Sequence, residues 1–183
     1  MLIVGRTKEQ DILNTALHSE KAEFYVVYGR RRVGKTYLIK EYFNQRFSFF
    51  ATGIANEKTR SQLRAFNLAL KQYGCKENTI PQDWFEAFER LKQLLQDQRV
   101  YRDPVTKKRV IFLDELPWMD TARSDFKSAL EFFWNSYGSS QGDLLLIVCG
   151  SATSWIINNI LLAKGGFYNR ITGQIHLCPF SLK

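Results

Sequence analysis

The fold of this chain is decided by the stretch Gly29-Arg30-Arg31-Arg32-Val33-Gly34-Lys35-Thr36. It matches the pattern G-x-x-x-x-G-K-[ST] and stands between an apolar run at 24–28 and a helix-like segment that continues through Tyr37. A strand before and a helix after are the context in which this pattern forms a phosphate-binding loop. The glycines let backbone N–H groups point at phosphate oxygens, and the helix N-terminus adds its dipole. Lys35 can reach the β and γ phosphates, and Thr36 can offer its hydroxyl to Mg²⁺, so the stretch predicts a bound nucleotide.

Length and composition indicate one globular domain over residues 1–183. The contents of 45% hydrophobic and 24% charged residues are ordinary for a folded domain. The longest purely apolar run, residues 144–149, is far shorter than a membrane span, so we expect no membrane partner. The apolar start of the chain is too short for a secretory signal. Three scattered cysteines without metal-ligand spacing fit a reducing compartment, which predicts a cytoplasmic protein.

The formal charge of +8 favours anionic partners. Part of this charge is local to the loop, where Arg30, Arg31, Arg32 and Lys35 lie together. The remainder permits nucleic acid as a partner, and a basic surface that is merely solvated accounts for it equally well. The three arginines occupy the variable positions of the loop, where only backbone N–H groups are needed. Their side chains are therefore available to solvent, substrate or a partner.

Strand-like and helix-like segments alternate along the chain. Apolar runs predict strands at 24–28, 47–53, 110–113, 144–149 and 174–177. Apolar periodicity predicts helices at 7–18, 35–45, 57–73, 83–95, 124–137 and 154–162. The polar, turn-rich residues 99–108 predict a loop or a short hairpin. The alternation indicates an α/β fold with a parallel sheet and right-handed crossovers.

Several helices carry local signals. Thr7 is a predicted N-cap, with Gln10 completing a capping box, and Asp83 and Ser154 are predicted N-caps of later helices. Gly74 is a predicted C-cap. The inner face of the helix that follows Asp83 is predicted to consist of Phe85, Phe88, Leu91, Leu94 and Leu95.

Polar residues follow two of the predicted strands directly. Asp114 and Glu115 come after the third strand, and Ser151 comes after the fourth. In open parallel sheets, ligand-binding groups lie at the carboxyl ends of the strands. We therefore expect the phosphate-binding loop, the two carboxylates and Ser151 to meet in space.

The two carboxylates predict different roles. Asp114 can hold Mg²⁺ through water, opposite Thr36. Glu115, beside it, can orient and polarise an attacking water, a function that a protein which only binds nucleotide does not need. The alternative is that the pair simply ends a strand and starts a turn at Pro117.

Three further residues are candidates for contacts around the nucleotide. Ser151 can hydrogen-bond the γ-phosphate or the water, although a strand-ending Gly-Ser is also common as a plain turn. Arg170, just before the fifth strand, could reach a γ-phosphate in its own subunit or in a neighbour's, or be a surface arginine paired with a carboxylate. Arg6 is a candidate for holding the loop on the adenine side. The predicted nucleotide-binding residues are thus Val4, Gly5, Arg6, Gly29, Arg30, Arg31, Arg32, Val33, Gly34, Lys35, Thr36 and Tyr37.

The order of these motifs resembles a known family. The motifs are Val4-Gly5-Arg6-x-x-Glu9, the loop Gly29–Thr36, Phe112-Leu113-Asp114-Glu115-x-Pro117, Gly150-Ser151, and Asn169-Arg170 followed by Leu177-x-Pro179-Phe180. Together they resemble the prokaryotic (archaeal and bacterial) ATPase-domain family of P-loop NTPases, which is related to the AAA+ and STAND ATPases. The first and third motifs occur in P-loop ATPases in general. The arginine-rich loop, together with Arg170 and Leu177-x-Pro179-Phe180, makes the resemblance specific to this family.

The resemblance implies a three-layer α/β core with five parallel strands in the order 5-1-4-3-2, acting as an ATP-dependent switch or motor. It implies ATP and Mg²⁺ as ligands, with ADP as product. The implied roles are Lys35 and Thr36 on phosphate and Mg²⁺, Asp114 on Mg²⁺, Glu115 as base, Ser151 as sensor and Arg170 as a finger, in cis or in trans within a homo-oligomer. Family members usually continue into a helical lid or winged-helix region and an output domain, which we expect to be absent from this chain.

Two other functions remain open at this point. A P-loop kinase would transfer phosphate to a small acceptor, and it would need an arginine-rich lid and an acceptor pocket. A basic binding module would keep ATP as a structural ligand and bind nucleic acid with little turnover. Asp114-Glu115 together with Ser151 favours hydrolysis over both.

Overall fold

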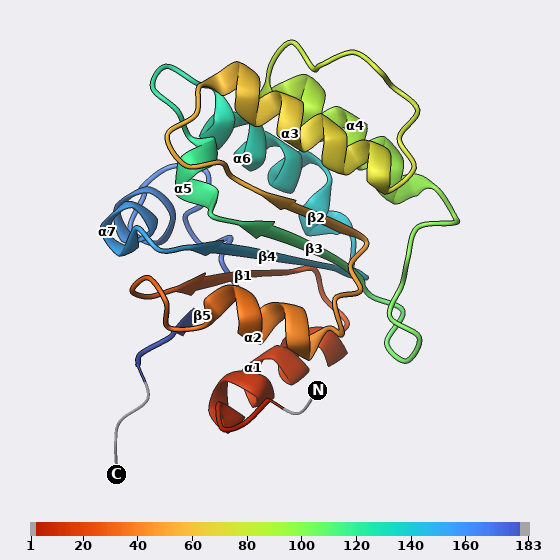
Figure 1. The fold of residues 1–183 in the computed structure, drawn as a ribbon. Helices are drawn as coiled ribbons and strands as arrows, with labels where there is room; N and C mark the ends of the chain where they lie inside the picture. Colours follow the sequence, from red (N-terminus) through yellow and green to blue (C-terminus); the bar gives the residue numbers. More distant parts are fainter. Residues whose placement is uncertain (1–2, 180–183) are drawn as a thin grey trace.

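The computed structural model describes residues 3–179, so Phe180 of the last motif lies outside the described residues. A single sheet forms the middle layer, with α1 and α2 on one face and α3, α4 and α6 on the other (Figure 1). The strands are β1 (Glu23–Tyr28), β2 (Phe49–Thr52), β3 (Arg109–Asp114), β4 (Leu144–Gly150) and β5 (Gly173–His176). All four pairings are parallel, in the order β2-β3-β4-β1-β5. This confirms the predicted α/β class and strand order.

The central strands are buried because both faces are covered by helices. Every residue of β3 and of β4 is buried, and four of the six residues of β1 are. Since the strands are parallel, all their carboxyl ends lie at one end of the sheet and all their amino ends at the other. We call these the carboxyl end and the amino end of the sheet.

The helices largely follow the predicted segments. They are α1 (Thr7–His18), α2 (Lys35–Tyr42), α3 (Thr59–Gln72), α4 (Trp84–Gln96), α5 (Leu116–Met119), α6 (Phe126–Ser136) and α7 (Thr153–Ile156), with a 3₁₀ turn η1 (Gly138–Ser140) and a π-helical turn η2 (Ile157–Leu161). The side chain of Asp83 caps α4 by accepting the N–H of Glu86 at 2.8 Å, as predicted. Residues 99–108 form a loop, which includes the turn around Asp103.

Four local predictions are wrong, each for a packing or backbone reason. The N-cap of α1 is Arg6, so Thr7 forms no capping box, and the side chain of Gln10 instead donates to Gly5 O at 2.8 Å. The N-cap of α7 is Ala152 rather than Ser154. Asn44 and Gln45 adopt left-handed φ angles of 50° and 56°, so α2 stops at Tyr42.

The fourth error concerns the apolar face of α4. Phe88 and Leu91 are buried in the core between the sheet and the helices, whereas Phe85 is 40% exposed and meets the exposed Phe132 of α6 edge to face. Helical spacing alone placed Phe85 on the inner face, but it lies at the margin of the stripe. In the described residues no helix is both long enough and apolar enough to cross a membrane.

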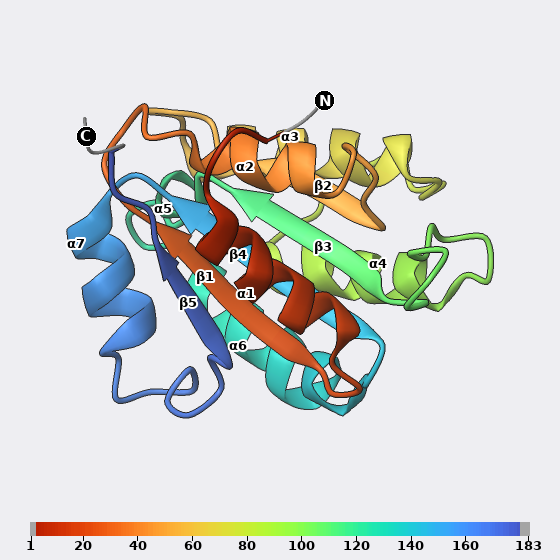
Figure 2. The same cartoon turned by 90° about the horizontal axis from the view of Figure 1, so that it is seen from below.

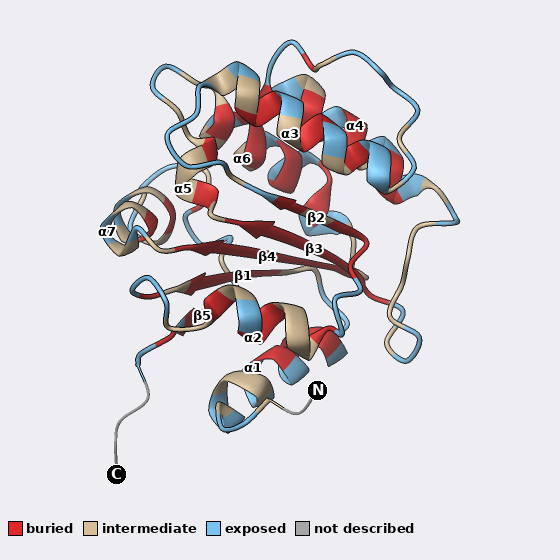
Figure 3. Cartoon of the chain, in the orientation of Figure 1, coloured by how far each residue is buried: buried red, intermediate tan, exposed pale blue. Residues whose placement is uncertain are grey.

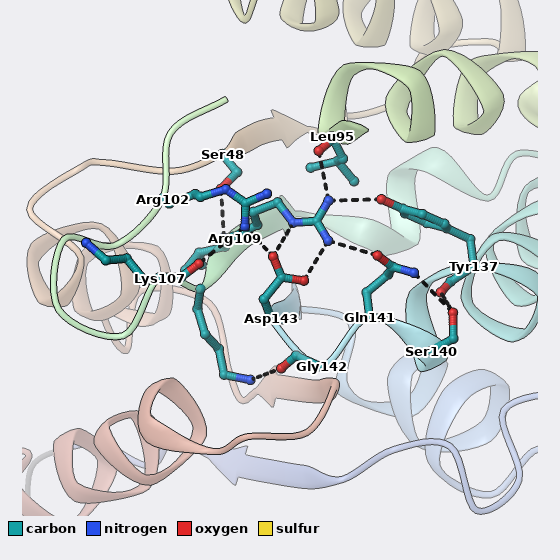
Figure 4. A network of polar contacts seen from close by, with 12 residues as sticks. Ser48, Leu95, Arg102, Lys107, Arg109, Tyr137, Ser140, Gln141, Gly142 and Asp143 are labelled. Atoms are coloured by element: carbon teal, nitrogen blue, oxygen red, sulfur yellow. Dashed lines mark hydrogen bonds and ion pairs between the residues drawn. The ribbon is translucent and has the colours of Figure 1, made fainter. Parts of the chain in front are cut away.

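An extended polar network closes the amino end of the sheet (Figure 4). Arg109, the first residue of β3, is 3% exposed and binds both carboxylate oxygens of Asp143, with Nη2–Oδ1 and Nε–Oδ2 distances of 2.7 and 2.9 Å. Its other N–H groups donate to Leu95 O, to the hydroxyl of Tyr137 and to Gln141 Oε1. All five guanidinium donors therefore have acceptors.

Candidate active site

The phosphate-binding loop connects the carboxyl end of β1 to α2, and its shape requires glycine at two positions. Gly29 has φ +148°, and a Cβ atom there would lie 2.2 Å from Leu177 O of the segment after β5. Gly34, with φ +91°, is the N-cap of α2. A side chain at either position would strain the backbone. The loop is thus fixed between β1, β5 and the first turn of α2, whose N–H groups have no partner within the helix.

Lys35 points into this loop. Its side chain is buried, and Nζ donates to Gly29 O and to Arg30 O, both at 2.8 Å. The ammonium group has three donors, so these two bonds leave one for another acceptor. The lysine is held where the phosphate-binding pattern needs it.

Thr36 and Asp114 join the loop to the end of β3. The Thr36 hydroxyl donates to Asp114 Oδ2 at 2.8 Å, and the N–H of Glu115 donates to Asp114 Oδ1 at 2.9 Å. Burial raises the pKa of Asp114 above its usual value, and these two hydrogen bonds offset part of that rise. A bound cation would favour the ionised carboxylate.

Glu115 is held by Ser151. The Ser151 hydroxyl lies 2.8 and 2.9 Å from the two carboxylate oxygens of Glu115, so the ends of β3 and β4 are joined side chain to side chain. Glu115 has φ 49° and ψ 43° as the N-cap of α5. This left-handed conformation is unfavourable for a residue with a side chain, by about 1 kcal/mol. Such strain is common at functional positions.

Two glycines at the strand ends make room for this segment, and the sequence reasoning named only one of them, Gly150, as part of the Gly150-Ser151 motif. A Cβ atom on Gly53, after β2, would lie 2.5 Å from Glu115 O. A Cβ atom on Gly150, at the end of β4, would lie 2.7 Å from Pro117 Cδ. Close approach of backbone therefore lets α5 pack across the strand ends and aims Glu115 at Ser151.

A cavity of about 500 Å³ brings most of the predicted residues together. It is lined by Arg31, Arg32, Gly34, Lys35, Thr36, Tyr37, Glu115 and Ser151. A second cavity of about 460 Å³ lies against the outer side of the loop, and Arg31 and Arg32 line both. The second cavity is lined by Arg6, Arg30, Arg31, Arg32, Val33, Gly34 and Pro179.

Arg6 connects the start of the chain to the loop and to the segment after β5. Its guanidinium donates to Cys178 O at 2.6 Å and to Val33 O at 3.4 Å, and it lies 3.3 Å from a carboxylate oxygen of Glu9. Viewed from below, the segment before α1 and the segment after β5 lie at the same end of the sheet (Figure 2). Val4 and Gly5 lie next to Arg6, and Val4 is exposed.

Cys149, one of the three scattered cysteines, lies on β4 near the carboxylates. It is fully buried, close enough to the Asp114 carboxylate to feel its charge. Burial, followed by the charge of Asp114, raises the pKa of the Cys149 thiol well above its usual value. The thiol is therefore neutral beside this carboxylate.

Arg170 is not brought to this site within one chain. It lies exposed before β5, and two residues later the N–H of Thr172 donates to Phe24 O at 2.9 Å, at the amino end of β1. The phosphate-binding loop leaves the other end of that strand. Four residues of extended chain, about 13 Å, separate Phe24 from Tyr28. Arg170 therefore lies far from the phosphate-binding loop of its own chain, and its role as a finger stays a prediction.

A comparison with models of protein families identifies the family of this chain. A model of an ATPase domain found predominantly in Archaea matches residues 3–183. The chain belongs to this family. This ATPase-domain family is of the P-loop type, as the sequence motifs indicated.

Relatives and solved structures agree with this assignment. A protein of Methanocaldococcus jannaschii is 26% identical over 186 residues, which cover 100% of this chain and 37% of that protein. The Walker-type ATPase of Pyrococcus abyssi aligns with a TM-score of 0.61 and 21% identity, covering 97% of this chain and 54% of that one. The ORC2 protein of Aeropyrum pernix, solved as ADPNP–ADP complexes, aligns with a TM-score of 0.65 and 17% identity, covering 96% and 48%. At these identities the structures show the fold, and this chain spans little more than a third of the first relative.

Proposed function

We propose that this ATPase domain hydrolyses ATP with Mg²⁺ at the carboxyl end of its sheet. The observation that carries the proposal is the position of Glu115. Its carboxylate lies beside Asp114, is held by Ser151 at 2.8 and 2.9 Å, and lines the same cavity as Lys35 and Thr36. A protein that only binds nucleotide has no need of a second carboxylate there.

The substrate is positioned by the loop. Backbone N–H groups of the loop and of the first turn of α2 bind phosphate oxygens, and Lys35 turns from the loop carbonyls toward the β and γ phosphates. Arg31 and Arg32, which line both cavities, lie along the nucleotide as it crosses the loop. The nucleoside part then occupies the outer cavity beside Arg6.

The residues present fit a magnesium ion. Thr36 Oγ1 and Asp114 Oδ2 are 2.8 Å apart, so both oxygens are close enough together to hold one magnesium ion, whose bonds to oxygen are about 2.1 Å long. When bound there, the ion would neutralise charge on the β and γ phosphates. Thr36 and Asp114 would hold it, directly or through water.

Glu115 then acts on the water. Its carboxylate accepts a proton from water as the water oxygen bonds to the γ-phosphorus, and the bond from that phosphorus to the β–γ bridging oxygen breaks. The products are ADP and inorganic phosphate. Ser151 holds the Glu115 carboxylate in position. It also lines the cavity, where its hydroxyl can bind either the water or a γ-phosphate oxygen.

A switch or motor role is part of the same proposal. The chain covers 37% of the length of the Methanocaldococcus relative, so the activity and partners of a whole protein go beyond this domain. ATP hydrolysis here would drive a change in an attached region or in a neighbouring copy. Arg170 is exposed and remote from its own site, and in this proposal it contacts the site of another subunit.

The test compares wild type with Glu115→Gln, measuring steady-state phosphate release and nucleotide affinity in parallel. We expect the variant to lose about 100-fold or more in turnover, because it cannot accept a proton, while ATP affinity stays within about threefold. Glu131→Gln, the same chemical change at a half-buried helical position outside the site, is the matched control and should leave turnover unchanged. Equal phosphate release by wild type and Glu115→Gln would remove Glu115 from the mechanism.

A further inference from the structure

The positive excess of this chain lies in two short segments. Of 26 basic residues, four lie at 30–35 and five at 58–76, and neither segment contains an acidic residue. The remaining 17 basic residues are balanced by 18 acidic residues. Residues 30–35 belong to the phosphate-binding loop. Residues 58–76 contribute no side chain to the site, yet they carry five positive charges of a net eight.

These charges form a line on the outside of α3. Arg60, Arg64 and Lys71 are all exposed, and at 100° and 1.5 Å per residue they lie within about 40° of one another over about 16 Å. We call these three residues the α3 ridge. Lys58 precedes it and Lys76 follows it, both exposed. α3 belongs to the outer layer of the molecule, and exposed residues run along it (Figure 3).

The ridge does not serve the stability of the helix. Among the described residues, no ion pair involves Arg60, Arg64 or Lys71. The neighbouring helix α4 differs, because its basic residues pair with acidic ones: Arg90 with Glu86 at 2.5 Å, and Lys92 with Glu89 at 3.7 Å. Like charges four residues apart, and cations in the first turn, both disfavour a helix. α3 is held by its other face, where Leu63, Phe66 and Leu70 are buried.

We propose that the α3 ridge binds the phosphate backbone of duplex DNA. A row of exposed cations with no acidic residue among them is complementary to a regular line of phosphates. The ridge carries no aromatic side chain on which unpaired bases could stack, which favours a duplex over a single strand. The apolar face of α3 is used in the core, and only Leu68 is both apolar and exposed on this helix, so a membrane surface is a poor fit. The contacts are to the backbone, and the binding is therefore independent of base sequence.

The helix that carries the ridge is linked to the nucleotide site by hydrogen bonds. Gln62, within the first turns of α3, binds the N–H and the C=O of Ile54 at 2.9 and 2.6 Å. The preceding residue, Gly53, donates to Asp114 O at 3.0 Å. A duplex on the ridge would thus contact a helix that is fastened to the segment beside the two carboxylates. The DNA-binding proposal itself does not depend on ATP hydrolysis.

The test uses fluorescence anisotropy with a labelled 20-base-pair duplex of arbitrary sequence, over a range of salt concentrations. The variant Arg60→Gln/Arg64→Gln/Lys71→Gln is compared with the charge-matched control Lys8→Gln/Arg46→Gln/Lys164→Gln, whose three residues are exposed elsewhere. For the ridge variant we expect about 30-fold weaker binding at low salt. The slope of log affinity against log salt should become shallower by about 2.7, as for three lost phosphate contacts. The control should lose less than about threefold.

Several results would overturn the proposal. They are an equal loss in the control, tighter binding of a single strand than of the duplex, ridge-dependent binding to anionic vesicles without duplex binding, or no duplex binding by wild type at low salt. Circular dichroism melting establishes that both triple variants are folded. ATP affinity, measured by calorimetry on the same samples, should be unchanged in the ridge variant. A failure of ATP hydrolysis would leave the anisotropy result intact, so the two proposals fail separately.

Discussion

The two ends of the β-sheet use their polar residues in opposite ways. At the amino end, all five N–H donors of Arg109 have acceptors, and Asp143 receives further hydrogen bonding from Arg102. At the carboxyl end, Lys35 bonds only to two carbonyls of its own loop, and Glu115 has an unfavourable left-handed backbone. At the amino end the donors of the buried arginine are all used within the fold, whereas the carboxyl end holds charged groups beside a cavity.

This difference separates stability from activity. Where each buried donor and acceptor already has a partner, removing one leaves an unsatisfied charge and weakens the fold. Where charged groups hold only their own loop or a neighbouring side chain, a ligand can take over those bonds. Substitutions at the amino end should therefore change unfolding, and substitutions at the carboxyl end should change nucleotide chemistry.

The largest effect is expected for Lys35→Ala. Removal of the ammonium should weaken ATP binding about 100-fold, equal to about 2.7 kcal/mol, because a charge-assisted bond to phosphate is lost. Titration calorimetry measures the affinity. The stability in urea should change by less than about 1 kcal/mol, since Lys35 bonds only to two carbonyls of its own loop. Lys40→Ala, in the last turn of the same helix, is the control. Unchanged ATP affinity in Lys35→Ala would contradict the phosphate-loop assignment.

The next effect is expected for Asp143→Asn at the amino end. The change leaves the buried guanidinium of Arg109 without its charged partner and should lower the free energy of unfolding by about 2 kcal/mol at pH 7. ATP affinity should remain that of wild type. Asp97→Asn is the control, because Asp97 pairs with the exposed Arg99 on the surface and should shift the urea midpoint much less.

The stability lost in Asp143→Asn should depend on pH, and the direction of this dependence follows from the pKa of Asp143. Burial alone would raise the pKa of Asp143, but hydrogen bonds from Arg109 and Arg102 outweigh burial and lower it. A carboxyl group with a lowered pKa stabilises the fold above its unfolded value, near pH 4, and this contribution disappears as the pH falls through the folded value. The stability difference between wild type and Asp143→Asn should therefore be full at pH 6 to 7 and shrink below pH 4. A difference that is constant from pH 7 to pH 3 would contradict the ion-pair explanation.

The comparison of the two ends also shows which features sequence could predict. Each group around the cavity directly follows a strand or belongs to a loop with its own local pattern, so Lys35, Asp114 and Ser151 could be placed from order along the chain. The amino-end network could not, because Arg109 and Asp143 are 34 residues apart and each lies next to a polar loop. Their pairing depends on the register of β3 with β4, which no local signal encodes.

The helix α5 was missed for a similar reason. Pro117 favours a turn, and it is the close approach of Gly150 to this proline that lets a short helix form across the strand ends. Likewise, the left-handed residues Asn44 and Gln45 end α2 although its apolar periodicity continues. These features arise from tertiary contact and backbone conformation, which residue type alone does not determine.

The smallest effect in dilute solution is expected for Arg170→Ala, and it tests whether the two ends of the sheet meet between molecules. Arg170 lies toward the amino end, far from the site of its own chain, so turnover of the dilute variant should stay within about twofold of wild type. If a second copy brings Arg170 to the γ-phosphate, wild-type turnover per chain should rise with protein concentration, and the variant's should not. Mixing concentrated Arg170→Ala with Glu115→Gln should then restore activity, because an interface can combine Glu115 from one chain with Arg170 from the other. An arginine that acts in trans is worth about 10³-fold in rate in related chemistry, so even a minority of mixed interfaces would be measurable. No gain on mixing, in a sample that sedimentation shows to be assembled, would assign Arg170 to the surface of the domain and leave the carboxyl end as the whole of the site.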